Sequence, residues 1–263
     1  MRLEDLKDKV VIITGAGGGI GQALAKGYAE QGSKVVLADV SVEKALEAKE
    51  IIDQCGGTSF AIKCDVTNEK DVMNMVGEVI NQFNTIDILV NNAGVETGTK
   101  PLTELREDEW DLILNVNLKG PFLCSKHVGK LFCEKREGVI INIASLTAKI
   151  PRWYLGAYST SKAAVVQLTK VMALEMAEYN VRVNAVCPGA TNTPMFEETQ
   201  KSNPNFSLDH FLLGNPKTFR AGIPLRRVAD PEDQVNAALY LSSSAANHIT
   251  GQLIFVDGGE SVI

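Results

Sequence analysis

The chain has 263 residues, 45% of them hydrophobic, so it can bury a large core and does not have the composition of a disordered protein. Its formal net charge of −6, with acidic and basic residues intermixed, argues against a nucleic-acid-binding surface, which needs clustered lysine and arginine. Residues Met1 to Lys9 alternate charged and apolar side chains without a signal-peptide core, and no uncharged apolar run approaches a membrane span. We therefore expect a soluble, cytoplasmic protein with no nucleic-acid or membrane partner.

Strand-like and helix-like segments alternate along the chain, as they do in a doubly wound α/β fold. The strand-like runs are almost continuously apolar, which is typical of parallel strands covered on both faces. The predicted strands are Val10–Thr14, Lys34–Asp39, Ser59–Cys64, Ile86–Asn91, Gly138–Ala144, Val181–Cys187 and Leu253–Asp257. The predicted helices are Ile20–Gln31, Val42–Cys55, Glu69–Phe83, Asp108–Glu134, Ala157–Tyr179 and Pro231–Ser243. This pattern predicts one domain over residues 1–263, built on a seven-stranded, mainly parallel sheet with helices on both faces.

A glycine-rich segment follows the first predicted strand and leads directly into a helix. The dinucleotide fingerprint G-x-G-x-x-G does not fit, because Ile20 stands where its third glycine belongs, whereas G-x-x-x-G-x-G fits with Gly15, Gly19 and Gly21. Glycines at such a turn let the backbone approach a pyrophosphate, which the free N–H groups of the helix N-terminus attract. The alternative is a glycine-rich turn that binds nothing. The residues we expect at the cofactor phosphates are Gly15, Gly17, Gly18, Gly19, Ile20 and Gly21.

An acidic residue, Asp39, ends the second predicted strand, 18 residues after Gly21. A carboxylate at this place can accept hydrogen bonds from the adenosine ribose and would repel a 2′-phosphate. Since Val40 and Ser41 supply no positive charge, we expect NAD in preference to NADP. Asp39 could instead be a solvated turn residue. The pair Asp65-Val66 is placed to read an adenine, although Asp65 could equally be a turn or helix-capping residue.

Three polar side chains are predicted to meet at the carboxyl edge of the sheet. Tyr158 and Lys162 are four residues apart in a predicted helix and therefore share one of its faces. Ser145 lies 13 residues before Tyr158, just beyond a strand end, where ligands bind in open α/β sheets. Each feature is weak by itself, but their combination predicts a catalytic site.

Taken together, the motifs resemble those of the short-chain dehydrogenase/reductase family, in the same order and spacing from Lys9 to Gly259. These motifs are Thr14-Gly15-x-x-x-Gly19-x-Gly21, Asn91-Asn92-Ala93-Gly94, Asn117 in Asn-Val-Asn-Leu, Ser145, Tyr158-x-x-x-Lys162 and Pro188-Gly189. The resemblance implies a Rossmann-like fold, NAD(P) as hydride carrier, a homotetramer and an Asn117-Ser145-Tyr158-Lys162 tetrad. It also implies cofactor contacts from Asn92, Ala93, Gly94, Tyr158, Lys162, Pro188, Gly189, Thr191 and Thr193. Asn91 is expected to be structural.

The residue types fit the oxidation of a secondary alcohol. Removing the hydroxyl proton needs a base, and a free phenol with a pKa of about 10 is a poor base at neutral pH. The ammonium of Lys162 and an oxidised nicotinamide would lower the pKa of Tyr158, which would act as base in oxidation and acid in reduction. Ser145 would bind the substrate oxygen. By the resemblance, Asn117 would hold a water on a proton path to Lys162; alternatively it is a helix-interior residue that bonds the backbone.

The segment Ala190–Ile223 is long, lacks clear periodicity and contains Pro194, Pro204 and Pro216. We expect it to be an irregular, apolar lid over a carbon ring or chain, although its apolar residues could pack on the core or on another subunit. The expected substrate contacts are Ser145, Trp153, Tyr158 and Met195.

Three functions are compatible with these residues. The first is an NAD-linked dehydrogenase of a secondary alcohol, the second a reductase of 3-oxoacyl thioesters, and the third a catalytically silent NAD-binding protein. Asp39 speaks against the second, because such reductases typically use NADPH. The five cysteines include no C-x-x-C pair and are odd in number, which fits buried thiols in a reducing compartment, and His127, His210 and His248 lack metal-ligand spacing. We expect no metal site.

Overall fold

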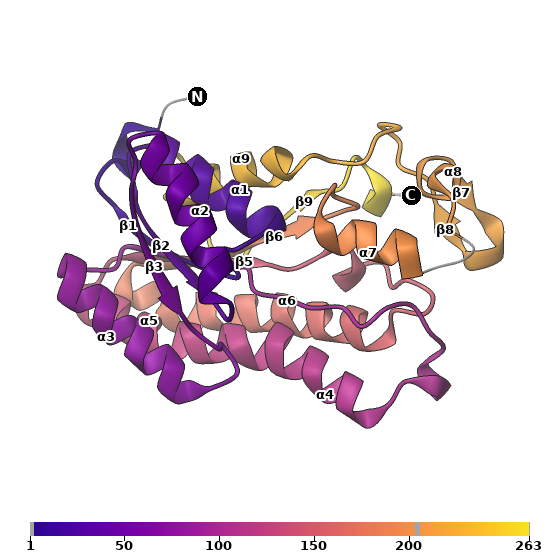
Figure 1. The fold of residues 1–263 in the computed structure, drawn as a ribbon, viewed down its shortest axis with the longest axis horizontal. Coiled ribbons are helices and arrows are strands. Elements are labelled where there is room, and N and C mark those ends of the chain that lie inside the picture. The colour runs from indigo at the N-terminus through magenta and orange to yellow at the C-terminus, as the bar shows by residue number, and fades with distance from the viewer. Residues whose placement is uncertain (1–2, 203–205, 263) are drawn as a thin grey trace.

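A seven-stranded, entirely parallel sheet forms the centre of the protein (Figure 1). The computed structural model describes residues 3–202 and 206–262. The strand order is β3-β2-β1-β4-β5-β6-β9, so that chain order reverses direction between β1 and β4. In open α/β sheets, ligands bind beyond the carboxyl ends of the strands at such a reversal. The strands are β1 (Val10–Thr14), β2 (Lys34–Asp39), β3 (Thr58–Lys63), β4 (Ile88–Asn91), β5 (Gly138–Ile143), β6 (Val181–Pro188) and β9 (Leu253–Val256).

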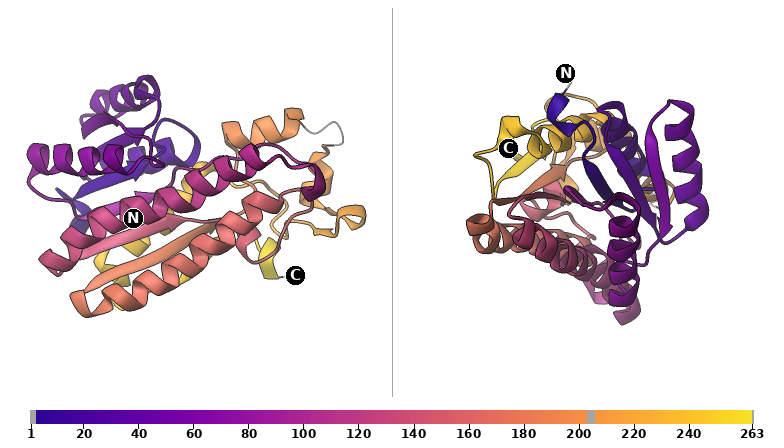
Figure 2. Two further views of the ribbon diagram at one scale, coloured as in Figure 1. Left: turned by 90° about the horizontal axis from the view of Figure 1, so that it is seen from below. Right: turned by 90° about the vertical axis from the view of Figure 1, so that its left-hand side faces the viewer.

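Helices cover both faces of this sheet, and each face has its own apolar core (Figures 1 and 2). On one face lie α1 (Gly19–Glu30), α2 (Val42–Gln54) and α9 (Pro231–Ser242), and α1 packs against α9. On the other lie α3 (Glu69–Phe83), α5 (Gly120–Lys135) and α6 (Gly156–Met176). The sequence-based prediction of a single doubly wound, Rossmann-like domain is confirmed, and its strand ends are correct to within two residues. The sheet is wholly rather than mainly parallel.

One predicted helix, Asp108–Glu134, is in fact two helices joined by a π-helical turn. Helix α4 (Glu107–Leu114) passes through the π turn Asn115–Lys119 into α5, whose first turn contains Pro121. Proline has no N–H to donate within a helix, and a wider turn accommodates that missing bond. The backbone N–H of Gly120 bonds to the carbonyl of Asn115, and Asn117 is completely buried. Pro121 was the sequence signal for this break.

The segment 190–223 is not irregular, contrary to the expectation. It contains α7 (Pro194–Ser202), α8 (Leu208–Leu212) and a small hairpin of β7 (Gly214–Asn215) with β8 (Arg220–Ala221), beyond one end of the sheet in Figure 1. Pro194 begins α7 instead of preventing a helix, since the first helical position needs no N–H donor. Pro204 lies outside the described residues. Within the segment, Phe196, Phe206 and Phe211 pack on one another, with ring centroids 5.1–6.0 Å apart.

The structure also bears on membrane-spanning helices, metal-binding clusters and the state of the cysteines. In the part of the chain that the structure describes, no helix combines the length and apolar character needed to cross a bilayer. Residues 3–202 and 206–262 also hold no cluster of three potential metal-binding side chains. All five cysteines are free; three are buried, whereas Cys133 is partly and Cys55 fully exposed.

Candidate active site

A cavity of about 1820 Å³ lies where the carboxyl ends of the strands meet the segment 190–223. It is long enough to carry a glycine-rich loop at one end and Ser145, Tyr158 and Lys162 further along. Of the site residues expected from the sequence, only Gly21 and Asn117 do not line it. The expected residues that do are Gly15, Gly17, Gly18, Gly19, Ile20, Asp39, Asp65, Val66, Asn92, Ala93, Gly94, Ser145, Trp153, Tyr158, Lys162, Pro188, Gly189, Thr191, Thr193 and Met195.

The glycine loop between β1 and α1 depends on missing side chains at two positions. Gly15 has a positive φ of 63°, and a Cβ there would lie 2.8 Å from the Cα of Ala93. A Cβ on Gly21 would lie 2.1 Å from the carbonyl oxygen of Gly15, so Gly21 allows the helix to pack on the loop without itself reaching the cavity. At Gly18, the residue before α1, a Cβ would meet no atom within 4 Å. The helix N-terminus therefore faces open space with uncapped N–H groups, as an anion site requires.

Asn92 and Thr14 hold the loop in this shape. The side-chain amide of Asn92 donates to the carbonyls of Thr14 and Gly15, both at 3.0 Å. The hydroxyl oxygen of Thr14 in turn accepts the N–H groups of Asn92 and Ala93, both at 3.1 Å. Asn92 thus positions the glycine loop as well as lining the cavity. Asn91 acts within the sheet, as expected, because its amide donates to Asn142 on β5 at 2.8 Å.

At the end of β2, Asp39 lines the glycine-loop end of the cavity. A cation that we had not expected, Lys44 on α2, lines the same region. Residues 40 and 41 carry no positive charge, but the first turn of α2 brings Lys44 back to the glycine loop, where its Cβ lies 2.5 Å from the place that a Cβ on Gly17 would take. Asp65 uses one carboxylate oxygen for a local turn, accepting the N–H of Thr67 at 2.9 Å. Asn68, rather than Asp65, caps α3.

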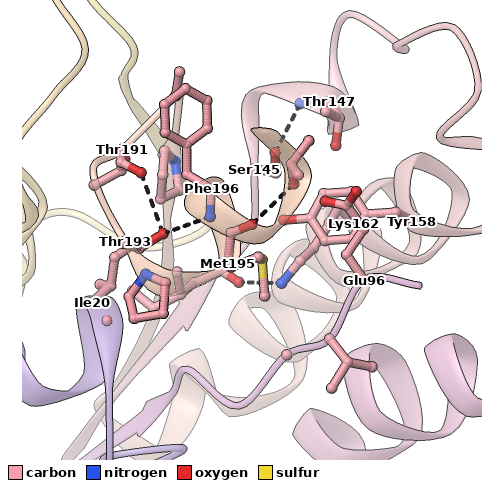
Figure 3. Close-up of a pocket in the computed structure, with 18 of the residues that line it drawn as sticks. Ile20, Glu96, Ser145, Thr147, Tyr158, Lys162, Thr191, Thr193, Met195 and Phe196 are labelled. Atoms are coloured by element: carbon pink, nitrogen blue, oxygen red, sulfur yellow. Dashed lines mark hydrogen bonds between the residues drawn. The ribbon is translucent and has the colours of Figure 1, made fainter. Parts of the chain in front are cut away.

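The residues Ser145, Tyr158 and Lys162 converge on one part of the cavity (Figure 3). Ser145 follows β5, and its hydroxyl oxygen accepts the N–H of Thr147 at 3.1 Å. The ammonium nitrogen of Lys162 donates to the carbonyl of Ile143 at 2.9 Å and lies 5.6 Å from the centre of the Tyr158 ring. The spacing of Tyr158 and Lys162 in α6 places both side chains on one face of the helix, and Ser145 lies next to this face because it follows the end of β5.

Burial is the main influence on the electrostatics of these groups. Burial raises the pKa of Tyr158 above its usual value; the negative charge of Glu96 raises it further, and a hydrogen bond with Ser145 opposes both. Burial lowers the pKa of Lys162 to about 8. Lys162 is not among the groups that shift the pKa of Tyr158, so the lowering that we expect from Lys162 together with an oxidised nicotinamide stays a prediction. Burial also raises the pKa of Glu96 to about 7.

Asn117 is buried behind the cavity wall at the π turn. Its side-chain oxygen accepts the N–H of Val95 at 2.8 Å, and its amide nitrogen donates to the carbonyl of Val95 at 3.0 Å and to Ser161 at 3.1 Å. Both amide hydrogens are thus used within the protein. This arrangement agrees with the alternative in which Asn117 bonds the backbone, and it fixes the loop that follows Gly94 along the cavity.

The far end of the cavity has apolar walls and charges that the sequence analysis missed. Trp153 stacks on Tyr154. Met195 and Phe196 come from α7, and Phe196 is only 9% exposed. Glu96, two residues after the Asn-Asn-Ala-Gly motif, also lines the cavity, and its place after that motif predicts it as a wall of the site. Arg152 and Arg220 also line this end, and both contact the buried Glu260. No local pattern joins these three residues, because they come from distant parts of the chain.

Comparisons with known proteins extend the agreement to the whole chain. A family model described as enoyl-(acyl carrier protein) reductase matches residues 15–261. The 2,3-dihydro-2,3-dihydroxybenzoate dehydrogenase of Bacillus subtilis (strain 168) is 36% identical over 264 residues, which cover 100% of this chain and 99% of that one. A crystal structure of 3-ketoacyl-(acyl-carrier-protein) reductase from Brucella melitensis, complexed with NADH, has a TM-score of 0.87 at 35% identity and covers 97% of this chain and 99% of the other.

A third relative is a 7α-hydroxysteroid dehydrogenase complexed with NADH and 7-oxo glycochenodeoxycholic acid. It is 34% identical, with a TM-score of 0.87, and the match covers 98% of this chain and 96% of that chain. Matches of this length and identity, together with the glycine loop and the Ser145-Tyr158-Lys162 arrangement, establish the family. The chain belongs to the short-chain dehydrogenase/reductase family of oxidoreductases.

Proposed function

We propose that the protein is an NAD-dependent dehydrogenase that interconverts a secondary alcohol and a ketone. The observation that carries this proposal is the convergence of Ser145, Tyr158 and Lys162 in the cavity that also contains the glycine loop and Asp39. The cofactor fits the residues present, because Gly15 and Gly21 leave no room for side chains at the loop while Gly18 faces open space at a helix N-terminus. When bound, the dinucleotide supplies the hydride acceptor or donor.

The roles follow from the hydrogen bonds. The oxygen of Ser145 accepts the N–H of Thr147, and its hydroxyl is hydrogen-bonded with Tyr158; with substrate bound, the serine proton would be donated to the substrate oxygen. Tyr158 takes the hydroxyl proton in oxidation and returns it in reduction. Bringing a phenol from a pKa of about 10 to 7 costs roughly 4 kcal/mol, and burial of Tyr158 increases that cost. Lys162 in its protonated form offsets part of the cost, and its ammonium is also placed to bind the nicotinamide ribose.

The reduction of 3-oxoacyl thioesters is the second candidate. Asp39 is compatible with this reaction, since the 3-ketoacyl-(acyl-carrier-protein) reductase from Brucella melitensis was crystallised in complex with NADH. What favours a free alcohol over a carrier-bound thioester is the segment 190–223, which covers the substrate end of the cavity with α7, α8 and the β7–β8 hairpin. A covered end suits a small molecule better than the arm of a carrier protein.

The test is a panel of secondary alcohols, ketones and an acetoacetyl thioester, assayed with NAD(H) and NADP(H) by nicotinamide absorbance. We expect turnover of alcohols and ketones with NAD(H). Turnover of the thioester at a higher kcat/KM than every ketone would favour the second candidate, and the absence of turnover with all compounds would refute both.

A further inference from the structure

Two arginines and one glutamate form a cluster at the substrate end of the cavity. Arg152 comes from the loop before α6, Arg220 from β8 in the segment 190–223, and Glu260 from the 3₁₀ turn Glu260–Val262 after β9. One carboxylate oxygen of Glu260 accepts Nη2 of Arg152 at 2.5 Å and Nη2 of Arg220 at 2.8 Å. Glu260 is completely buried, and the two arginine side chains are only 8% and 14% exposed.

The hydrogen bonds of this cluster are incomplete. Two guanidinium groups share one oxygen of Glu260. The negative charge of the buried Asp257 also acts on Arg152, but the carboxylate of Asp257 accepts the N–H groups of Gly259 and Ser261. Among the described residues, Nε of Arg220 and the second oxygen of Glu260 are buried without any hydrogen-bond partner. Buried charges are ordinarily paired and fully hydrogen-bonded. The Nε–H of Arg220 is therefore a donor that one further anionic group can satisfy.

The two cations face the cavity and the carboxylate lies behind them. Arg152 and Arg220 line the cavity together with Ser145 and Tyr158, whereas Glu260 is not among its lining residues. The guanidinium of Arg220 lies 3.7 Å from the ring centre of Phe211, which holds its plane against the aromatic cluster of the segment. A fixed, planar guanidinium is the group that recognises a carboxylate by paired hydrogen bonds.

We propose that Arg152 and Arg220 bind a carboxylate on the substrate whose hydroxyl is oxidised at Tyr158. This inference rests on the proposed function and narrows the substrate to hydroxy acids. The carbon skeleton between the hydroxyl and the carboxylate lies against the apolar residues of the segment, such as Met195 and Phe196. Glu260 holds the two guanidinium groups together and is a positioning residue.

The first experiment measures binding without turnover. Benzoate and benzamide have the same ring and differ in charge, so calorimetric titration of each, with and without NADH, isolates the carboxylate contribution. We expect benzoate to bind about 10- to 100-fold more tightly than benzamide, the range of a charge-assisted hydrogen-bonded pair. Equal affinity for the two probes, or no binding of benzoate at millimolar concentration, would overturn the proposal even if the enzyme oxidises neutral alcohols.

Variants of the two arginines then show which residues cause the preference for benzoate over benzamide. Arg152→Gln and Arg220→Gln should each remove most of the preference for benzoate, and Arg152→Lys should retain part of it by keeping the charge. The control is Arg226→Gln, since Arg226 is exposed, lies close to Arg220 in the chain and does not line the cavity. A melting temperature for each variant shows whether it is folded. An equal loss in Arg226→Gln would attribute the preference to the general charge of the segment and overturn the assignment.

The carboxylate and the amide are then compared as substrates, by measuring the reduction of 3-oxocyclohexanecarboxylate and 3-oxocyclohexanecarboxamide with NADH. We expect the acid to have a kcat/KM at least about 10-fold higher than the amide, with most of the difference in KM, because the carboxylate contact is remote from the reacting carbon. If neither ketone is reduced but benzoate discrimination persists, the proposed reaction fails and the carboxylate site remains. Equal kcat/KM for the two ketones would refute a role for the site in substrate selection.

Discussion

The carboxylate of Asp39 accepts a hydrogen bond from the backbone N–H of Gly17, with 2.9 Å between oxygen and nitrogen. Its other oxygen accepts the N–H of Ser41 at 3.0 Å. These two bonds join the end of β2 to the glycine loop and hold the carboxylate at the edge of the cavity. A ribose with free hydroxyls can donate to the remaining lone pairs, whereas a 2′-phosphate would meet a fixed negative charge.

We therefore expect NAD(H) to give a kcat/KM at least about 10-fold higher than NADP(H), as one unfavourable charge contact costs on the order of 1.4 kcal/mol. Asp39→Ser should remove most of this preference, because Lys44 then remains as the cation nearest the ribose. Steady-state kinetics with both cofactors check this. The double variant with Lys44→Gln is the control and should lose the gain in NADP(H) use. Equal kcat/KM in the wild type would contradict the prediction.

Replacing Tyr158 by phenylalanine removes only the phenolic oxygen. We expect Tyr158→Phe to keep NADH affinity and to lower kcat by roughly 10²–10⁴, the range for loss of a general acid–base group. Tyr179→Phe, in the 3₁₀ turn Ala177–Tyr179 after α6 and outside the cavity, is the matched control. Fluorescence titration with NADH and steady-state rates give the two readouts. More than a tenth of wild-type kcat in Tyr158→Phe, with chemistry rate-limiting, would exclude the assigned role.

The pH dependence of oxidation should depend on Glu96. Burial raises the pKa of this carboxyl to about 7, so Glu96 is mainly ionised above that pH, and its negative charge raises the pKa of Tyr158. Glu96→Gln removes that charge, so Tyr158 should lose its proton at lower pH. We expect the rising limb of kcat/KM for oxidation to shift down by about 0.5 to 1 pH unit.

The control for this shift is Glu104→Gln, which removes an exposed carboxylate outside the cavity. It should leave the pH profile in place. An unchanged or upward-shifted profile in Glu96→Gln would show that Glu96 does not influence the proton transfer.

Helices α5 and α6 expose large apolar side chains that fit the proposed homotetramer. Leu174 is 81% exposed, Phe122 46% and Val171 40%, and β9 forms an uncovered edge of the sheet. We expect light scattering to give the mass of a tetramer at micromolar concentration, and Leu174→Glu to reduce it. Leu46→Glu, at a 47% exposed position on α2, is the control and should have no effect. A monomer mass for the wild type would refute the tetramer. Ile263, at the chain end that we expected to pack on a neighbour, lies outside the described residues.

The segment 190–223 should gain order when cofactor and product bind. Phe196, Phe206 and Phe211 of this segment pack on one another, and Phe219 is 90% exposed. Outside the segment, Phe219 contacts Trp153 and Arg220 pairs with Glu260, both at the cavity end of the molecule. Hydrogen exchange should show less protection in α7 and α8 than in β1, β4 and β5, and a marked increase with NADH and product. Protection equal to that of the core strands without ligand would show that the segment is ordinary packed structure.

Local sequence patterns were sufficient for the sheet and for the central part of the site. The apolar runs determined the strands, the spacing of Gly15, Gly19 and Gly21 determined the loop, and the four-residue separation of Tyr158 and Lys162 placed them on one helix face. These features depend on the period of a strand or helix and on the steric freedom of glycine. Such constraints act within a few residues and can be read in the linear chain.

Other features were decided only by tertiary packing. Arg152 and Glu260 are 108 residues apart and meet because the turn after β9 lies against the loop before α6. Asn117 turns inward because the π turn before Pro121 changes the helical register, and its hydrogen bonds to Val95 and Ser161 depend on that turn. The pKa of Tyr158 likewise follows from the desolvation caused by its surroundings. Burial and the approach of charges from distant segments have no local signal, so the sequence predicted the reaction class while the folded protein determined the charge at the substrate end.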